Sequence, residues 1–262
     1  MIFTILSPAK KLDFSRSLPC VETTQPALMD DATVLMSIVR DLNLDQIVQL
    51  MGVSEKLAAL THARFEALDL PFSVGNAQAA ALIFDGEAYR GLDAGSLTIP
   101  DLEWAQDHVG ILSGLFGLLR PLDLIQPYRL EISTRLKTAR GSNLYQFWGE
   151  GITARINQML ASTDTAILLN LASAEYFKAV KVKVLKARVI TPVFHEVKEG
   201  QPGKVISFSA KFARGLMARF IVEHRIEDPE ALKKFDLERY TFQPDISKND
   251  TWVFSREFVP AR

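Results

Sequence analysis

Two short, largely apolar runs at distant places in the chain constrain the fold more than any other feature. Residues 2–6 (IFTIL) and 166–171 (AILLNL) each have the length and composition of a buried β-strand. Segments with helical spacing of apolar residues separate them, among them 26–42 and 148–160. Because strands and helices intermix, the sequence predicts an α/β fold, a single domain over 1–262 whose mixed sheet is flanked by helices.

The second half of the chain carries further signals of both kinds of element. Residues 189–197 and 204–208 flank a Gly-Gln-Pro-Gly turn, which predicts a β-hairpin. Ser209 is placed to cap a long helix that continues to about Arg225. Residues 252–258 alternate between apolar and polar side chains, a pattern typical of a closing strand.

Composition excludes several classes of protein. Hydrophobic residues make up 48% of the 262, which is too many for a disordered chain. No apolar run approaches the roughly 18 residues that a membrane span requires, so we expect no membrane partner. Cys20 is the single cysteine and cannot form an internal disulfide. Nothing therefore indicates an oxidising compartment, and the N-terminus does not resemble a secretory signal, so we expect a cytoplasmic protein.

Charge is unevenly distributed along a chain whose formal net charge is only −1. Residues 170–219 hold ten Lys or Arg and three acids, an excess of seven positive charges. Such a segment favours an anionic partner. Lysines spread by chance over several solvated faces explain the same excess about as well.

Signatures of metal and nucleophile chemistry are mostly missing. The four histidines are far apart, and His195-Glu196 lacks the second histidine of a zinc-protease helix. No cysteine cluster, no Gly-x-Ser-x-Gly elbow and no Walker loop occur. We therefore predict no metal site and no cofactor, and the sequence identifies no catalytic residue.

Residues 46–65 resemble the helix-hairpin-helix of proteins that bind DNA without sequence specificity. A first helix ends near Gly52, which tolerates a positive φ, and Ser54 can cap a second helix. Hairpin amides and a helix N-terminus converge there, an arrangement that suits a phosphate. The motif usually has a glycine where Ser54 stands, and a plain helical hairpin fits the spacing equally well. The predicted DNA-binding residues of this helical subdomain, residues 26–70, are Gly52, Val53, Ser54, Lys56 and Arg64.

Polar and basic motifs directly follow the two apolar runs. Residues 7–11 (SPAKK) and 170–178 (NLASAEYFK) occupy the place where open α/β sheets bind ligands. A rigid loop at 120–129 and the helix after Ser209 supply further cations. The predicted basic cleft comprises Lys10, Lys11, Arg120, Arg129, Lys178, Lys181, Lys211 and Arg214, with Ser7, Tyr128, Asn170, Ser173 and Tyr176 as candidate polar groups. The alternative is a set of separate surface ion pairs with Asp13, Asp123, Glu131 and Glu175.

Together these segments resemble the YaaA family of bacterial peroxide-stress-resistance proteins. The matching pieces run in order along the chain: ILSPAKKLDF, FDGEAYRGL, LSGLFGLLRPLDLIQPYRLEI, LYQFWG, NLASAEYFK and ISFSAKFARGLMARFI. The resemblance implies a cytosolic protein that protects against hydrogen peroxide and keeps unincorporated iron low. It also implies an unusual α/β fold with a helix-hairpin-helix, a positive cleft and DNA as a partner. It implies no catalytic residue.

Two hypotheses about activity follow. The first is a protector that binds duplex DNA through its phosphates and so limits damage by iron-derived hydroxyl radicals. The second is an enzyme that acts on a phosphorylated or otherwise anionic small molecule in the basic cleft. Salt dependence of DNA binding distinguishes them, since only the first predicts it. Direct iron sequestration has little support in the sequence.

Overall fold

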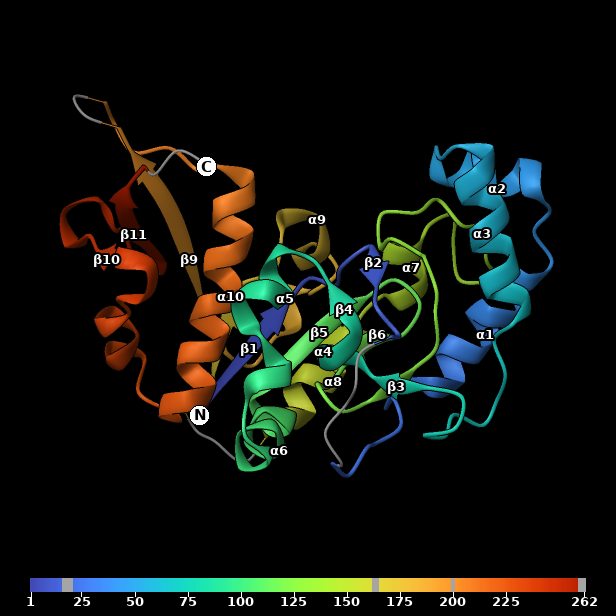
Figure 1. Ribbon diagram of the computed structural model, residues 1–262, viewed down its shortest axis with the longest axis horizontal. Coiled ribbons are helices and arrows are strands. Elements are labelled where there is room, and N and C mark those ends of the chain that lie inside the picture. Colours follow the sequence, from blue (N-terminus) through green and yellow to red (C-terminus); the bar gives the residue numbers. More distant parts are fainter. Residues whose placement is uncertain (16–20, 162–164, 199–200, 259–262) are drawn as a thin grey trace.

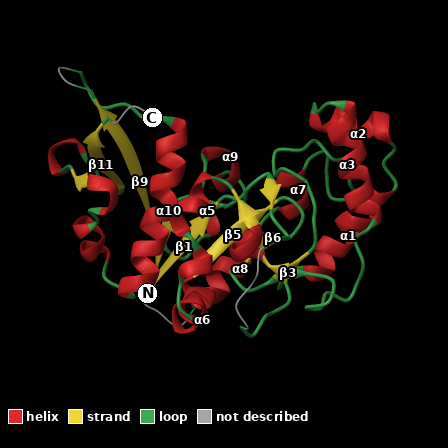
Figure 2. Ribbon diagram, in the orientation of Figure 1, coloured by secondary structure: helices red, strands yellow, loops and turns green. Residues whose placement is uncertain are grey.

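A seven-stranded mixed sheet forms the centre of the protein, as the sequence predicts (Figures 1 and 2). The computed structural model describes residues 1–15, 21–161, 165–198 and 201–258. Cys20 and Gly200, which entered the sequence argument, lie outside these ranges. In spatial order the strands are β10 (Thr241–Phe242), β11 (Thr251–Glu257), β9 (Arg188–Val197), β8 (Ile167–Asn170), β1 (Ile2–Leu6), β5 (Val109–Ser113) and β6 (Gly117–Leu119). The five central strands are parallel, and β10 and β6 close the two edges antiparallel.

The two apolar runs become adjacent strands in the middle of this sheet. Every residue of β1 and of β8 is buried, because helices cover both faces. Ile2 lies opposite Ile167 and Ile5 opposite Asn170, so the two strands end side by side. The chain goes from β1 to β5 on one side and only later to β8 on the other. This reversal of direction is the point at which open α/β sheets place their ligands.

Helices cover both faces of the sheet, and two short strand pairs form separate two-stranded sheets. Figure 1 shows α5 (Glu87–Leu92) and α10 (Ser207–His224) side by side over β1, with α8 (Gly151–Met159) on the far face. The other helices of the main body are α4 (Ala80–Ile83), α6 (Ile99–His108), α7 (Leu144–Trp148) and α9 (Ala174–Phe177). Two-residue strands pair as β2 (Lys11–Leu12) with β4 (Phe84–Asp85) and β3 (Gln78–Ala79) with β7 (Leu124–Ile125). Among the described residues, none of these helices is long and apolar enough to cross a membrane.

Backbone contact between α5 and α10 fixes the position of the long helix. A Cβ on Gly215 would lie 1.8 Å from the carbonyl oxygen of Ala88, and one on Gly91 would lie 2.2 Å from that of Phe212. Only glycine leaves room for this approach. The contact holds the middle of α10 against α5.

Three helices form a group at one end of the molecule, on the right in Figure 1. They are α1 (Met29–Arg40), α2 (Leu44–Met51) and α3 (Glu55–Glu66), so helices form on both sides of Gly52 as the sequence predicts. Asn43 and Gln46 cap α2 reciprocally, each side chain bonding the other's backbone N–H. Ala58 and Phe65 of α3 are buried and fix it to its neighbours.

The predicted hairpin at 189–208 is wrong in its second half. Residues 189–197 do lie in a strand, but 204–208 contribute only a single bridge between Lys204 and Glu196. The long helix begins at Ser207, two residues before the predicted cap, and Ile206 is its N-cap. Helix propensity in SFSAKFARGL therefore outweighs the apolar run that suggested a strand.

Candidate functional site

A pocket of about 540 Å³ opens at the carboxyl ends of β1 and β8. One part of its lining comes from residues 7–11 after β1 and 171–176 after β8. Residues 85–89 and the first half of α10 form two further walls. Residues 128–131 complete the lining. The sequence predicts polar groups at this edge of the sheet, and the topology explains why they meet here.

Hydrogen bonds join the two strand ends below the pocket. The backbone N–H of Ser173 donates to Ser7 Oγ at 2.9 Å, and the two hydroxyl oxygens lie 3.2 Å apart. Ser173 also caps α9, since its hydroxyl oxygen accepts from the N–H of Tyr176. Asn170, the other polar residue of this strand end, turns away and bonds Ala172 and Thr191.

Five of the eight predicted cleft cations line this pocket: Lys10, Lys11, Arg129, Lys211 and Arg214. The other three do not. Arg120 turns to Asp123, with its Nε 3.6 Å from Oδ1 of that fully buried carboxylate. The Lys178 ammonium lies 4.9 Å from the ring centre of Tyr145, and Lys181, beyond α9, is held through its backbone N–H by Thr153.

Carboxylates balance most of the positive charge of the pocket lining. Four acids share the lining with the five cations: Asp85, Glu87, Glu131 and Glu175. Glu131 Oε1 forms ion pairs with Arg129 Nη2 at 2.9 Å and with the Lys10 ammonium at 3.5 Å. Lys11 is ion-paired with Asp85. The ion pairs that the sequence left as the alternative therefore form in part, inside the pocket.

Arg214 and Lys211 differ from the other three cations of the pocket lining in having no acid partner among the described residues. Within the described part of the chain, neither side chain makes a hydrogen bond or an ion pair. Arg214 is half-buried, and this desolvation lowers the pKa of its guanidinium. The two lie one helical turn apart on the face of α10 that lines the pocket.

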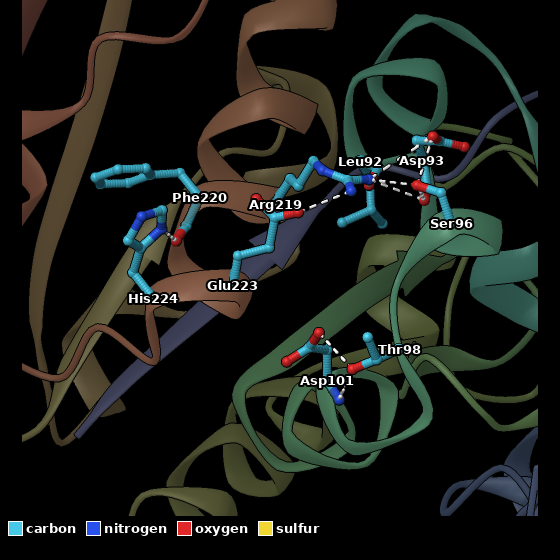
Figure 3. Close-up of polar contacts among 9 residues, drawn as sticks. All are labelled: Leu92, Asp93, Ser96, Thr98, Asp101, Arg219, Phe220, Glu223 and His224. Atoms are coloured by element: carbon cyan, nitrogen blue, oxygen red, sulfur yellow. Dashed lines mark hydrogen bonds and ion pairs between the residues drawn. The ribbon is translucent and has the colours of Figure 1, made fainter.

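Arg219, further along α10, is fully engaged (Figure 3). Its guanidinium pairs with Glu223 at 2.7 Å and donates to the carbonyl oxygens of Leu92 and Asp93, both at 3.1 Å. It also donates to Ser96 Oγ at 2.8 Å. Arg219 therefore fastens α10 to the loop after α5, and does not extend the pocket.

Three phenols lie in the pocket wall: Tyr89, Tyr128 and Tyr176. Burial is the main cause that raises the pKa of each, so all three stay protonated at neutral pH. The hydroxyl of Tyr89 donates to the carbonyl oxygen of Ser7, and that of Tyr128 lies 2.8 Å from Ser113 Oγ. These bonds hold the wall in shape.

Sequence reasoning missed the contribution of residues 85–89. In the stretch FDGEAYRGL the apolar residues Phe84 and Leu92 are buried, as is Tyr89. Asp85 and Glu87 nevertheless line the pocket, because β4 pairs with β2, whose first residue, Lys11, is the last of the SPAKK motif. The polar Asp-Gly-Glu within the apolar run was the available signal.

The α2–α3 turn has the backbone that its sequence predicts. Gly52 ends α2 with a φ of 60°, and nothing lies within 4 Å of where its Cβ would be. Ser54 caps α3 by accepting from the N–H of Leu57 at 3.4 Å, which leaves its hydroxyl proton free to donate. Lys56 is exposed on the first turn of α3 and, among the described residues, has no acid partner.

Arg64 connects this hairpin to the pocket. It lies near the C-terminal end of α3, and its pKa is lowered first by burial and then by the charge of Arg129. Arg129 lines the pocket, so the charge of a pocket residue acts on Arg64. No group of three His, Cys, Asp or Glu side chains suited to a metal ion occurs in the described ranges.

Comparison with known proteins gives consistent matches along the chain. A family model described as the peroxide stress protein YaaA matches residues 1–246. A UPF0246 protein of Bordetella petrii is 51% identical over 257 residues, which cover 98% of this chain and 100% of that protein. UPF0246 proteins of Ralstonia pickettii and Neisseria meningitidis serogroup B are 50% and 49% identical, each over 97% of this chain and over 99% and 98% of the respective proteins.

Proposed function

The chain belongs to the peroxide stress protein YaaA family, and from that premise we propose that it is a cytosolic protein that protects DNA by binding the duplex without sequence preference. The family supports a role in resistance to peroxide stress. The observation that carries the DNA-binding part is the open backbone at Gly52. A left-handed residue with no atom within 4 Å of its Cβ position lets a phosphate approach the hairpin amides.

Side chains around the turn add to this proposal. The Ser54 hydroxyl can donate to a phosphate oxygen, and Lys56 supplies an unpaired positive charge one residue into α3. Arg64, in the last turn of α3 and so at the other end of that helix, adds a second cation with no acid partner among the described residues. Glu55 is next to Lys56 in the sequence and offsets its positive charge. Binding therefore depends on backbone donors and a few phosphate contacts, and not on a strong positive electrostatic field.

Protection follows from the chemistry of the damage. Ferrous iron gives one electron to hydrogen peroxide, which divides into hydroxide and a hydroxyl radical. Iron held among the counterions of DNA produces that radical beside the sugar. A protein cation that neutralises a phosphate releases the counterions there, and iron is displaced with them.

Duplex binding across a salt series tests the proposal. We expect affinity to fall linearly in log salt, with similar values for unrelated sequences. The double variant Lys56→Gln, Arg64→Gln should reduce the slope by about two. Lys234→Gln serves as the control, because Lys234 is an exposed lysine on the 3-10 helix Pro229–Lys234, far from α3 in Figure 1. Affinity that does not change with salt would refute the proposal.

A further inference from the structure

Two unpaired cations on one wall of the pocket require an explanation. Arg214 and Lys211 present their charges to a cavity while every acid in its lining lies on another element. Arg219 on the same helix makes three hydrogen bonds to residues 92–96 and a close ion pair with Glu223, so an arginine of α10 can be fully partnered in this fold. Arg214 and Lys211 therefore lack acid partners because of where they lie, on the wall of the pocket, and not because α10 prevents such pairing.

An unpaired, half-buried guanidinium costs folding free energy. Taking a charge out of water is unfavourable unless an opposite charge or good acceptors replace the water. Arg214 has lost part of its hydration, and the described residues return no hydrogen bond. Local destabilisation of this kind is typical of binding sites, where the ligand supplies the opposite charge and the hydrogen-bond acceptors that the folded chain does not provide. An anion in the pocket would supply it.

The number of unpaired cations indicates the charge of that anion. A lysine and an arginine one turn apart carry two positive charges, so they suit a dianionic ligand better than they suit a ligand with a single carboxylate. The guanidinium offers a fork of donors and the ammonium a point charge, the usual combination for a phosphate. Lys10 and Arg129 are not available to the same extent, because both are paired with Glu131.

The other walls indicate what the anion is attached to. Among the described residues Glu175 has no cationic partner, although it lines the pocket, and its Oε1 accepts from Ser133 at 2.7 Å. Carboxylate oxygens are acceptors only, so they suit hydroxyl or amino groups on a ligand. A volume of about 540 Å³ is in the range of small-molecule sites and admits a single nucleotide or sugar phosphate.

We infer that the pocket binds a phosphate monoester of nucleotide size, with its dianionic phosphate between Arg214 and Lys211 and its hydroxyl or amino donors toward Glu175. This inference goes beyond duplex binding, because phosphates inside a duplex are monoanionic diesters. Two sources offer the same chemistry: a free nucleotide or sugar phosphate, and the 5′-phosphate at the end of a DNA strand.

Calorimetric titration of the full chain with 5′-AMP tests the inference, with adenosine as the ligand that lacks the phosphate. We expect AMP to bind and adenosine to bind far more weakly. Arg214→Gln should weaken AMP by about 10- to 100-fold, the usual range for a hydrogen bond to a charged group, while Lys234→Gln leaves it unchanged. AMP and adenosine binding equally, no binding of either, or an unaffected Arg214→Gln variant would each overturn the inference.

Stability separates a binding role from a structural one. Without ligand, Arg214→Gln should melt at the wild-type temperature or above it, because the substitution removes an unpaired charge. A clear loss of stability would identify Arg214 as structural and overturn the inference. Lys211→Gln, at an exposed position, is the second variant and should also weaken AMP.

Duplexes with and without a 5′-phosphate distinguish the two sources. Tighter binding of the phosphorylated duplex, lost in Arg214→Gln, would assign the pocket to strand ends. Equal binding of both duplexes, together with AMP binding, would assign it to a free phosphate monoester. This test does not depend on duplex binding by the α2–α3 hairpin. If Arg214→Gln loses AMP binding but keeps duplex binding, the result supports phosphate binding in the pocket, whatever the Lys56 and Arg64 variants show.

Discussion

Replacing Gly215 by alanine probes the contact that positions the cationic wall of the pocket. The new Cβ would lie 1.8 Å from the carbonyl oxygen of Ala88 and 2.8 Å from the backbone nitrogen of Leu92. Both neighbours are backbone atoms, so no side-chain rotation relieves the clash, and α5 and α10 must separate by more than an ångström. Overpacking of this kind costs about 3 kcal/mol or more, offset by about 1 kcal/mol of better helix propensity.

We therefore expect Gly215→Ala to lower the free energy of unfolding by about 2 kcal/mol or more, and the melting temperature by at least about 4 °C for a domain of this size. Gly151→Ala is the matched control. Gly151 is also helical, but nothing lies within 4 Å of its Cβ position, so this variant should be neutral or slightly stabilising. Thermal and urea unfolding measure both. A Gly215→Ala variant as stable as Gly151→Ala would refute the reasoning.

Three further substitutions test other contacts. Arg219→Gln should lower stability by about 1–3 kcal/mol in urea unfolding, because it loses Glu223 and two carbonyl acceptors; a wild-type midpoint would contradict this. Glu196→Gln should cost about 1–3 kcal/mol by the same assay, since the nearly buried Arg256 loses its buried carboxylate and keeps only the more exposed Glu238, and unchanged stability would contradict that pairing. Burial raises the pKa of Asp123, so just above the ordinary carboxyl pKa the folded state binds a proton that the unfolded state releases. Wild-type stability should therefore fall as pH rises through that window, relative to Asp123→Asn, and parallel pH profiles would contradict this.

The place of the pocket could be predicted from sequence, because it depends on local signals. The runs that form β1 and β8 are short, apolar and followed by polar residues, and parallel strands bring such ends together. Helices on both sides of Gly52 were predictable for a similar reason, since a left-handed glycine and a serine cap are local features.

The charge balance of the pocket could not be predicted, because it depends on tertiary pairing. Asp85 is brought beside Lys11 by the pairing of β4 with β2. These strands have two residues each, which is too short for a periodic pattern in the sequence. Arg120 does not line the pocket, because it forms an ion pair with the buried carboxylate of Asp123, three residues later in the chain. Arg214 and Arg219 look alike in the sequence, and only the packing of α10 on α5 decides which one is paired and which one is not.

The most direct test of the account measures DNA itself. A plasmid is exposed to ferrous iron and hydrogen peroxide with increasing protein, and strand breaks are counted at low and at physiological salt. We predict that wild-type protein and Lys234→Gln reduce breakage at low salt, that protection declines as salt rises, and that Lys56→Gln, Arg64→Gln protects less. Protection that is independent of salt and equal in all three proteins would contradict a mechanism based on binding DNA phosphates through the α2–α3 hairpin.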